Sequence, residues 1–190
     1  MIIENLSLGG DYLKVTTRVS GFTGVDWTFT PGCCLKVAGR YLAPAERKEE
    51  DVFTFVVKSD SFLLNENLPV AEPAAGTGFK HLDVEDVACL ASGTGIGAFI
   101  QLVSHRSRRE LKTTLQMVGR RVKKAALLTA FPQLESIDFG CWDTSFWGRP
   151  NLETEVIPAF RDSVVLYAGC KHLLEDLRSR PKCPTIHLNF

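Results

Sequence analysis

The chain has 190 residues, and its 22 Lys and Arg balance 22 Asp and Glu, so the formal net charge is zero. This balance argues against a protein that binds nucleic acid or anionic membranes through a global positive charge. No stretch reaches the roughly 18 consecutive apolar residues that suggest a membrane-spanning helix. Residues 1–15 lack the basic start and the small-residue cleavage site of a secretory signal.

The cysteines give no sign of a metal site. None of the six forms a Cys-x-x-Cys pair, and the four histidines are scattered. We therefore expect no zinc site with the spacing of a zinc finger. Buried thiols commonly behave as small hydrophobic groups. We expect the cysteines to be reduced and the protein to be cytoplasmic.

The N-terminal part has the pattern of short strands. Runs of β-branched and aromatic residues occupy 12–19, 33–39 and 51–59, and glycines, Pro31 and the charged segment 46–51 separate them. This spacing, with no run of helical periodicity between the strands, predicts a small antiparallel barrel or sandwich. Residues 68–83 are typical of a loop. We place a domain boundary near Asp83–Asp86, which divides the chain into residues 1–84 and 85–190.

A strand, a tight turn and a helix are predicted next. The apolar run 87–91 is followed by Ser92-Gly93-Thr94-Gly95 and then by apolar residues at helical spacing. Unpaired N–H groups at a helix N-terminus favour an anion there. A glycine turn can also serve only to reverse the chain, and Ala98 breaks the Gly-x-Gly-x-x-Gly fingerprint of ordinary dinucleotide-binding dehydrogenases.

The remaining segments alternate between the two kinds of element. Strands are predicted at 111–119, 136–143 and 163–169, and helices at 123–131, 151–160 and 170–180. Such alternation implies a parallel sheet that is covered on both faces.

The glycine turn resembles a turn of the ferredoxin-NADP reductase family. The stretch "LASGTGIGAF" is similar to that family's Gly-Gly-Thr-Gly-Ile-Ala-Pro-Phe sequence. Weaker similarities occur in the order that the family has: "FTPGCCLKV", "VFTFVVKS", "AEPAAGTGF", "VGRRVKK", "FWGR" and "VVLYAGCKHLLEDL". The resemblance implies a β-barrel plus α/β fold: a small antiparallel flavin-binding barrel followed by a parallel-sheet domain that binds NAD or NADP.

The resemblance also implies roles for individual residues. FAD would lie on the barrel, and NADP or NAD would lie across the carboxyl ends of the parallel strands, where hydride passes between the two rings. Gly93, Thr94 and Gly95 would seat the nucleotide pyrophosphate. The ribose or a 2′-phosphate would meet Arg121, with Arg120 or Lys123 nearby. Gly169 would approach the nicotinamide, and the C-terminal Phe190 would cover the flavin. Cys170 follows Gly169 at a strand-to-helix junction, where a helix N-terminus could lower the pKa of its thiol, although a buried inert thiol is the alternative.

The flavin-binding residues depart from the family pattern. The family's Arg-x-Tyr-Ser or Arg-x-Tyr-Thr motif corresponds only to "GRYLAPA". Arg40 matches the arginine, but Leu42 stands at the tyrosine position unless Tyr41 turns in, and Ala43 has no hydroxyl. Ala168 replaces the family's cysteine beside the nicotinamide.

Three functions follow from these residues. The first is an FAD-dependent NAD(P)H oxidoreductase that passes electrons to an unknown acceptor, which could be a protein. The alternative is a catalytically inactive reductase-fold protein that serves as a nucleotide-binding or assembly subunit. The third is nucleic-acid binding through "GRRVKK" and the aromatic segment 142–147, which the zero net charge disfavours.

Overall fold

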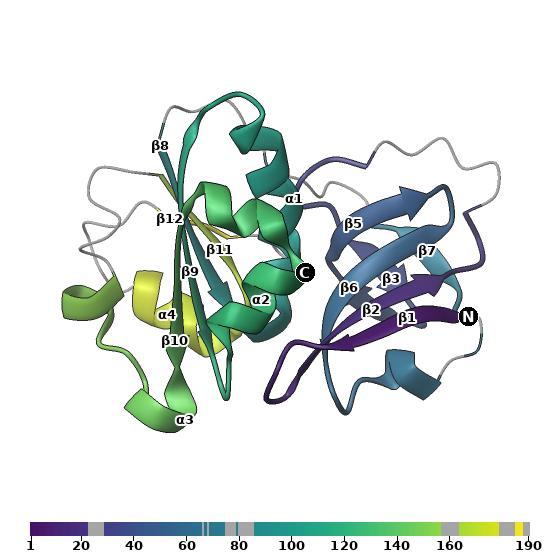
Figure 1. The fold of residues 1–190 in the computed structure, drawn as a ribbon, viewed down its shortest axis with the longest axis horizontal. Coiled ribbons are helices and arrows are strands. Elements are labelled where there is room, and N and C mark those ends of the chain that lie inside the picture. The colour runs from purple at the N-terminus through teal and green to yellow at the C-terminus, as the bar shows by residue number, and fades with distance from the viewer. Residues whose placement is uncertain are drawn as a thin grey trace.

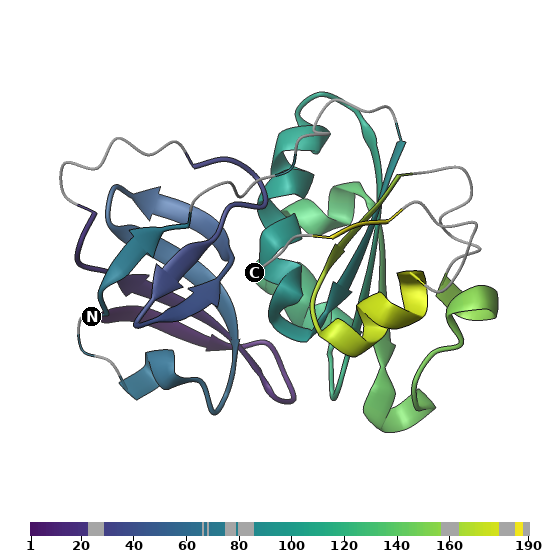
Figure 2. The same cartoon turned by 180° about the vertical axis from the view of Figure 1, so that it is seen from behind.

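The computed structural model describes residues 1–22, 29–65, 67, 69–74, 79, 86–156, 164–178 and 185–187. Figure 1 shows two halves side by side, an antiparallel β half and an α/β half, with α1 (Ile96–Ser107) between them. Figure 2 shows the same two halves from behind, with α4 (Lys171–Arg178) on the opposite face of the α/β half.

Two antiparallel sheets build the N-terminal half. The larger sheet has the order β1 (Ile2–Ser7), β2 (Tyr12–Arg18), β6 (Val52–Lys58), β5 (Pro44–Glu49). The smaller sheet has the order β4 (Arg40–Leu42), β3 (Leu35–Val37), β7 (Ala71–Pro73). A short helix, η1 (Phe62–Asn65), follows β6.

The two sheets share one apolar core. Val15 and Phe53 from the larger sheet and Leu35 from the smaller sheet are all fully buried in it. Phe22 adds an edge-to-face ring contact with Phe53, at a distance of 5.0 Å between centroids. The predicted antiparallel fold is confirmed.

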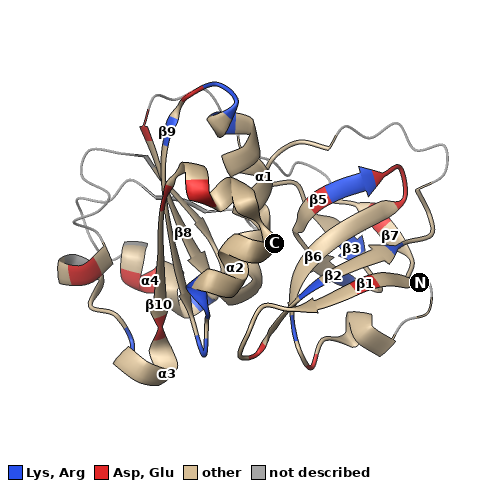
Figure 3. Ribbon diagram, in the orientation of Figure 1, with Lys and Arg blue, Asp and Glu red and all other residues tan. Residues whose placement is uncertain are grey.

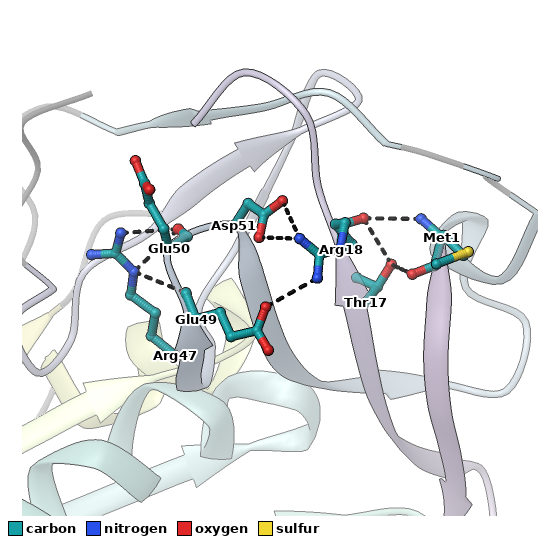
Figure 4. A network of polar contacts seen from close by, with 7 residues as sticks. All are labelled: Met1, Thr17, Arg18, Arg47, Glu49, Glu50 and Asp51. Atoms are coloured by element: carbon teal, nitrogen blue, oxygen red, sulfur yellow. Dashed lines mark hydrogen bonds and ion pairs between the residues drawn. The ribbon is translucent and has the colours of Figure 1, made fainter. Parts of the chain in front are cut away.

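Ion pairs and hydrogen bonds join the end of β2 to the start of β1 and to the β5–β6 turn (Figure 4). The Nη1 atom of Arg18 donates to both carboxylate oxygens of Asp51 at 2.7 Å, and its Nη2 atom lies 3.0 Å from Glu49 Oε2. The backbone of Met1 bonds to Thr17 and Arg18. Exposed pairs of this kind add little stability, so the core carries most of the folding energy of this half.

Two predictions in this half were wrong. Residues 68–83 were expected to form a loop, but residues 71–73 are β7, which pairs with β3. The charged segment 46–51 was expected to separate strands, but residues 46–49 belong to β5, which pairs with β6. β5 lies at the edge of its sheet. Charged side chains are common on edge strands because they oppose pairing with another chain.

The C-terminal half contains a five-stranded sheet whose strands are all parallel. Its order is β10 (Asp138–Asp143), β9 (Lys112–Gly119), β8 (Asp86–Ser92), β11 (Val164–Ala168), β12 (Thr185–His187). The predicted parallel sheet is confirmed.

Helices cover both faces of this sheet. Along β8, Cys89 and Ala91 face a core that includes α1 and α2 (Lys124–Ala130), whereas Ala88 and Leu90 face a second core that includes α4. Side chains of a strand alternate between its faces, so a strand covered on both sides is apolar throughout. The remaining helical segments are η2 (Gly93–Gly95), η3 (Pro132–Ser136), α3 (Thr144–Trp147) and η4 (Leu152–Val156).

In the segment that connects the two halves, the structure describes Phe79. The Phe79 ring stacks on the ring of Phe99 in α1, with 5.4 Å between the centroids. The predicted boundary near Asp83 lies outside the described residues, and β8 begins at Asp86. Within the described part of the chain, every helix is too short or too polar to span a membrane.

Candidate functional site

A cavity of about 520 Å³ lies between the two halves. Residues at or just beyond the carboxyl ends of four parallel strands line one wall: Ser92–Gly95 after β8, 118–120 at β9, Thr144 after β10, and Gly169 with Cys170 after β11. Residues of β2, β4 and β6, and Ala43 between β4 and β5, line the opposite wall: Tyr12, Tyr41, Leu42, Ala43, Val56 and Lys58. Loops and α4 add Arg149, Pro150, His172, Leu173 and Asp176.

The sheet order explains why a cavity forms here. From β8 the chain proceeds outward to β9 and β10, and it then crosses to the other side of β8 to form β11. The loops after β8 and β11 therefore leave the sheet in opposite directions, which opens a crevice at the carboxyl ends of the strands. Open α/β sheets bind ligands at such a switch point.

The glycine turn forms the floor of the cavity. Gly93 has a φ angle of +59°, which favours glycine, and it lies beneath the Tyr12 hydroxyl. A Cβ atom at Gly95 would clash with the Ala168 carbonyl group, and one at Gly97 would lie 2.7 Å from the Ala43 carbonyl oxygen. The glycines therefore bring together β8, β11, α1 and the barrel.

The continuous η2–α1 segment begins at the glycine turn, and the Ile96 backbone N–H at the start of α1 donates to the Gly93 and Thr94 carbonyl oxygens. The N-cap residue of α1 is Gly95, and no side chain among the described residues caps η2 or α1. The first N–H groups of an α-helix have no partner within the helix and carry a positive partial charge. The anion site predicted at the Gly93–Gly95 turn remains a prediction, and the N–H groups that would serve it are those of the turn.

Cys170 is an exposed thiol at the end of β11, just before α4. Ser92 Oγ donates to its sulfur at 3.4 Å. Burial raises the pKa of the Cys170 thiol, but hydrogen bonds from Ser92, the Leu173 backbone N–H and the Tyr167 hydroxyl outweigh burial, so the net pKa lies below the usual 9.0. Cys170 is thus the described cysteine best suited to exist as a thiolate in the cavity.

The predicted basic cluster is divided between two surroundings. Figure 3 shows its Lys and Arg residues between β9 and α2. Arg120 is exposed and lines the cavity. Arg121, with a φ angle of +54°, pairs with Asp11 of the β1–β2 turn at 3.6 Å, and Lys123 lies against Gly9 of the same turn. Neither Arg121 nor Lys123 lines the cavity.

Hydrogen bonds fix the loops after β9 and β10. The Arg120 backbone N–H donates to the Tyr12 hydroxyl, which is buried. Asp143 Oδ1 accepts from the Arg121 backbone N–H at 2.7 Å and from Ser145. These bonds lower the pKa of Asp143, led by the one from the Ser145 hydroxyl. The Asp143 carboxylate therefore remains ionised and holds the two loops together.

The flavin anchors implied by the resemblance do not fit this chain. The Arg40 guanidinium lies over the Phe62 ring, at 4.8 Å from its centroid, and does not line the cavity. Leu42 packs partly against the barrel core, and the Ala43 carbonyl faces Gly97. Tyr41 is 53% exposed and lines the cavity, so it is the one aromatic side chain of β4 that could meet a ring.

The structure thus brings together most of the predicted residues. Eight of them line one cavity: Tyr41, Leu42, Gly93, Thr94, Gly95, Arg120, Gly169 and Cys170. Arg40, Arg121 and Lys123 lie outside its lining, and Phe190 lies outside the described residues. Tyr12, Val56, Lys58 and Arg149 line the cavity but were not predicted, because no local sequence pattern marks side chains that only the domain packing brings together.

No protein-family model matches the sequence. No curated protein sequence matches it either. The similarity of this chain to known proteins therefore lies in the three-dimensional arrangement of its strands and helices.

Solved structures resemble the whole chain. A ferredoxin reductase of carbazole 1,9a-dioxygenase in its FAD apo form matches with a TM-score of 0.73 and 14% identity, over 100% of this chain and 65% of that chain. The FAD/NAD-binding domain of nitric oxide dioxygenase from Vibrio cholerae matches with a TM-score of 0.65 and 12% identity, over 99% and 97%. A cytochrome P450 reductase of Amycolatopsis matches with a TM-score of 0.67 and 14% identity, over 100% and 68%.

These likenesses agree with the two halves described above. Their low identities mean that they establish the arrangement of strands and helices and no more. The chain therefore has the ferredoxin reductase fold, an FAD-binding-type barrel followed by an NAD-binding-type α/β domain, in a strongly diverged form.

Proposed function

We propose that this chain binds a nicotinamide dinucleotide in the cavity between its two halves and acts as an NAD(P)H-dependent redox module. One observation carries the proposal: a cavity of about 520 Å³ lies at the switch point of a parallel sheet and is lined by the Gly93–Gly95 turn that leads into α1. Its volume is within the roughly 300–1,000 Å³ typical of small-molecule sites.

The residues present suit the parts of such a ligand. The pyrophosphate would lie on the Gly93–Gly95 turn, where no side chain at Gly93 blocks the approach to the backbone N–H groups of the turn. The nicotinamide would lie toward Gly169 and Cys170, which face the barrel wall across the cavity. Tyr41 on that wall offers an aromatic face.

Two candidate functions are compatible with this proposal, and they differ in whether the chain holds a flavin that accepts electrons from the nicotinamide. The nitric oxide dioxygenase domain binds FAD and NAD, and the ferredoxin reductase of carbazole 1,9a-dioxygenase has an FAD apo form, so an FAD-dependent reductase is the first candidate. The second candidate is a reductase-fold protein without flavin chemistry that binds the nucleotide as a subunit of a larger assembly. The placement of Arg40 on Phe62 and the packing of Leu42 favour this second candidate.

Dinucleotide binding is tested by isothermal titration calorimetry of the purified chain with NADH and with NADPH. Gly93→Ala should weaken binding, because its φ is left-handed and its new methyl group enters the cavity. Gly39→Ala is the matched control: its φ angle is +79°, so the backbone strain is similar, but Gly39 does not line the cavity. If neither dinucleotide binds at millimolar concentration, the proposal is wrong.

The visible absorption spectrum separates the two candidates. The chain is incubated with FAD or FMN, desalted and measured. A retained flavin band, together with NAD(P)H oxidation by an artificial acceptor, supports the reductase. A colourless chain that still binds NADH or NADPH rejects a resident flavin and supports the nucleotide-binding subunit.

A further inference from the structure

The free edge of β1 is exposed along its length. β1 is the outermost strand of the larger antiparallel sheet, and among the described strands it pairs with β2 alone (Figure 1). Residues 3–7 are all exposed, and the apolar side chains of Ile3 and Leu6 are 52% and 41% exposed. β1 therefore offers apolar surface together with an accessible strand edge.

The opposite edge of the same sheet is protected. β5 begins with Pro44 and has charged residues at each position from 46 to 49, and two register shifts interrupt its pairing with β6. Proline, charges and bulges all oppose the addition of another strand at a sheet edge. β1 has a single charged residue, Glu4, and its pairing with β2 is regular from Glu4 to Ser7, after one register shift beside Ile3. β1 is thus the edge of this sheet that can accept a further strand.

The direction of the backbone groups of β1 follows from its pairing with β2. The Leu8 N–H donates to the Tyr12 carbonyl at 3.0 Å. Residues of an antiparallel strand alternate between facing their partner strand and facing away from it. The N–H and C=O groups of Asn5 and Ser7 therefore point away from β2, and no other segment within the described part of the chain pairs with them.

We infer that this edge binds a second copy of the chain, with β1 antiparallel to β1 of the partner and Asn5 on the two-fold axis. The exposed residues 3–7 are centred on Asn5, so each of them then lies opposite an exposed residue of the other copy. Glu4 faces the partner's Leu6, and the Asn5 backbone groups of the two copies bond to each other. A second copy is favoured over an unrelated strand because the exposed stretch is complementary to itself in this two-fold arrangement. The dimer does not depend on the proposed function.

The neighbouring registers, with Glu4 or Leu6 on the axis, are less favourable. With Glu4 on the axis, the two Glu4 carboxylates would lie directly opposite each other, which destabilises a strand pair. With Leu6 on the axis, the partner's Ile3 would lie opposite Gly9. Gly9 belongs to the β1–β2 turn and lies against Lys123 of the α/β half, so the turn cannot continue the strand pairing.

The oligomeric state is measured by analytical ultracentrifugation of the full chain from about 1 µM to about 1 mM, with a reducing agent present. One added strand pair buries less than the roughly 1,200 Å² of a standard interface, so we expect a reversible dimer with a dissociation constant in the micromolar range. A monomer at every concentration overturns the inference. The proposed function would then still stand, because calorimetry with NADH and NADPH tests it separately.

Charged substitutions test which residue lies on the axis. Asn5→Lys places two ammonium groups opposite each other and should weaken dimerisation roughly threefold to fivefold. Leu6→Lys should leave dimerisation intact or strengthen it, because the new ammonium group faces the partner's Glu4. Val70→Lys is the matched control, since Val70 is an apolar residue of the barrel half that is 57% exposed and lies outside β1. A thermal melt checks that each variant folds. Dimerisation weakened by Leu6→Lys and not by Asn5→Lys, or weakened by Val70→Lys, overturns the inference.

Disulfide crosslinking measures the register directly. In a Cys170→Ser, Cys183→Ser background, Asn5→Cys should form an intermolecular disulfide on mild oxidation. Hydrogen-bonded residues across two antiparallel strands have Cα atoms about 5.5 Å apart, which suits a disulfide. Glu4→Cys and Leu6→Cys are matched controls, because both positions are exposed but their two-fold mates lie two residues further along the strand. Crosslinking of Asn5→Cys that does not exceed that of both controls overturns the inference.

Discussion

Cys170 is predicted to react with alkylating reagents much faster than the buried cysteines. Burial raises the pKa of Cys33, Cys34 and Cys141 to about 12, whereas that of Cys170 lies below 9.0. At pH 8 the thiolate fraction of the buried thiols is then roughly one in ten thousand, and that of Cys170 is larger. A thiolate of lower pKa is intrinsically less nucleophilic, but this effect cancels only about half of the difference in thiolate fraction on a logarithmic scale, so Cys170 should still react faster before access is considered.

The assay is alkylation by iodoacetamide between pH 6 and 9, followed by peptide mass spectrometry in a Cys183→Ser background. The rate at Cys170 should rise with pH and level off above its pKa, since only the thiolate reacts. Ser92→Ala removes a donor to the sulfur and should move the midpoint to higher pH. Ser104→Ala is the control, because Ser104 Oγ donates to the Ile100 carbonyl within α1 and does not line the cavity. A midpoint above pH 9, or equal rates at the buried cysteines, would refute the reasoning.

Three further predictions concern stability. Gly95→Ala should lower the free energy of unfolding, measured in urea, by about 1–3 kcal/mol, because the new Cβ atom meets the Ala168 backbone. Gly140→Ala should lower it less, because its Cβ atom meets a movable side chain. Phe99→Ala should cost about 3–5 kcal/mol, since this ring is fully buried, and a cost below 1 kcal/mol would contradict the packing described. The pKa of Asp143 is lower in the folded chain than the ordinary carboxyl pKa of 3.8, so the ionised carboxylate stabilises the fold above pH 3.8. This stabilisation is lost as the pH falls through the folded-state pKa, so Asp143→Asn should flatten the acid limb of a curve of stability against pH. An unchanged acid limb would count against the role given to this carboxylate.

The sequence predicted the long apolar elements well. The correctly predicted strands include β2, β6, β8 and β11. Each contains a run of apolar, β-branched or aromatic residues that favours a strand over a helix or a loop. β5 was missed because its residues are mostly charged and its pairing with β6 comes from tertiary structure. Local composition therefore predicts strands with buried side chains better than it predicts edge strands.

Some residues of the candidate site could likewise be predicted from the sequence, and others could not. The glycine turn and the end of β11 were predicted because strand ends in a parallel sheet converge at one edge. The choice among neighbouring cations could not be predicted. Arg120 and Arg121 are adjacent and chemically identical, yet a left-handed φ at Arg121 and a carboxylate on the β1–β2 turn direct one to the barrel and leave the other in the cavity.

The glycines of the turn show how packing and binding depend on the same atoms. Gly95 lets β11 approach α1, and Gly169 lies where a Cβ would clash with Ser92. These close approaches carry Gly93 and Cys170 to the same cavity wall. Packing alone therefore explains why positions 95 and 169 are glycine. Gly93 has open space above it apart from the Tyr12 hydroxyl, so the effect of adding a side chain at Gly93 reports on ligand binding. For this reason Gly93→Ala tests the function, and Gly95→Ala tests only the fold.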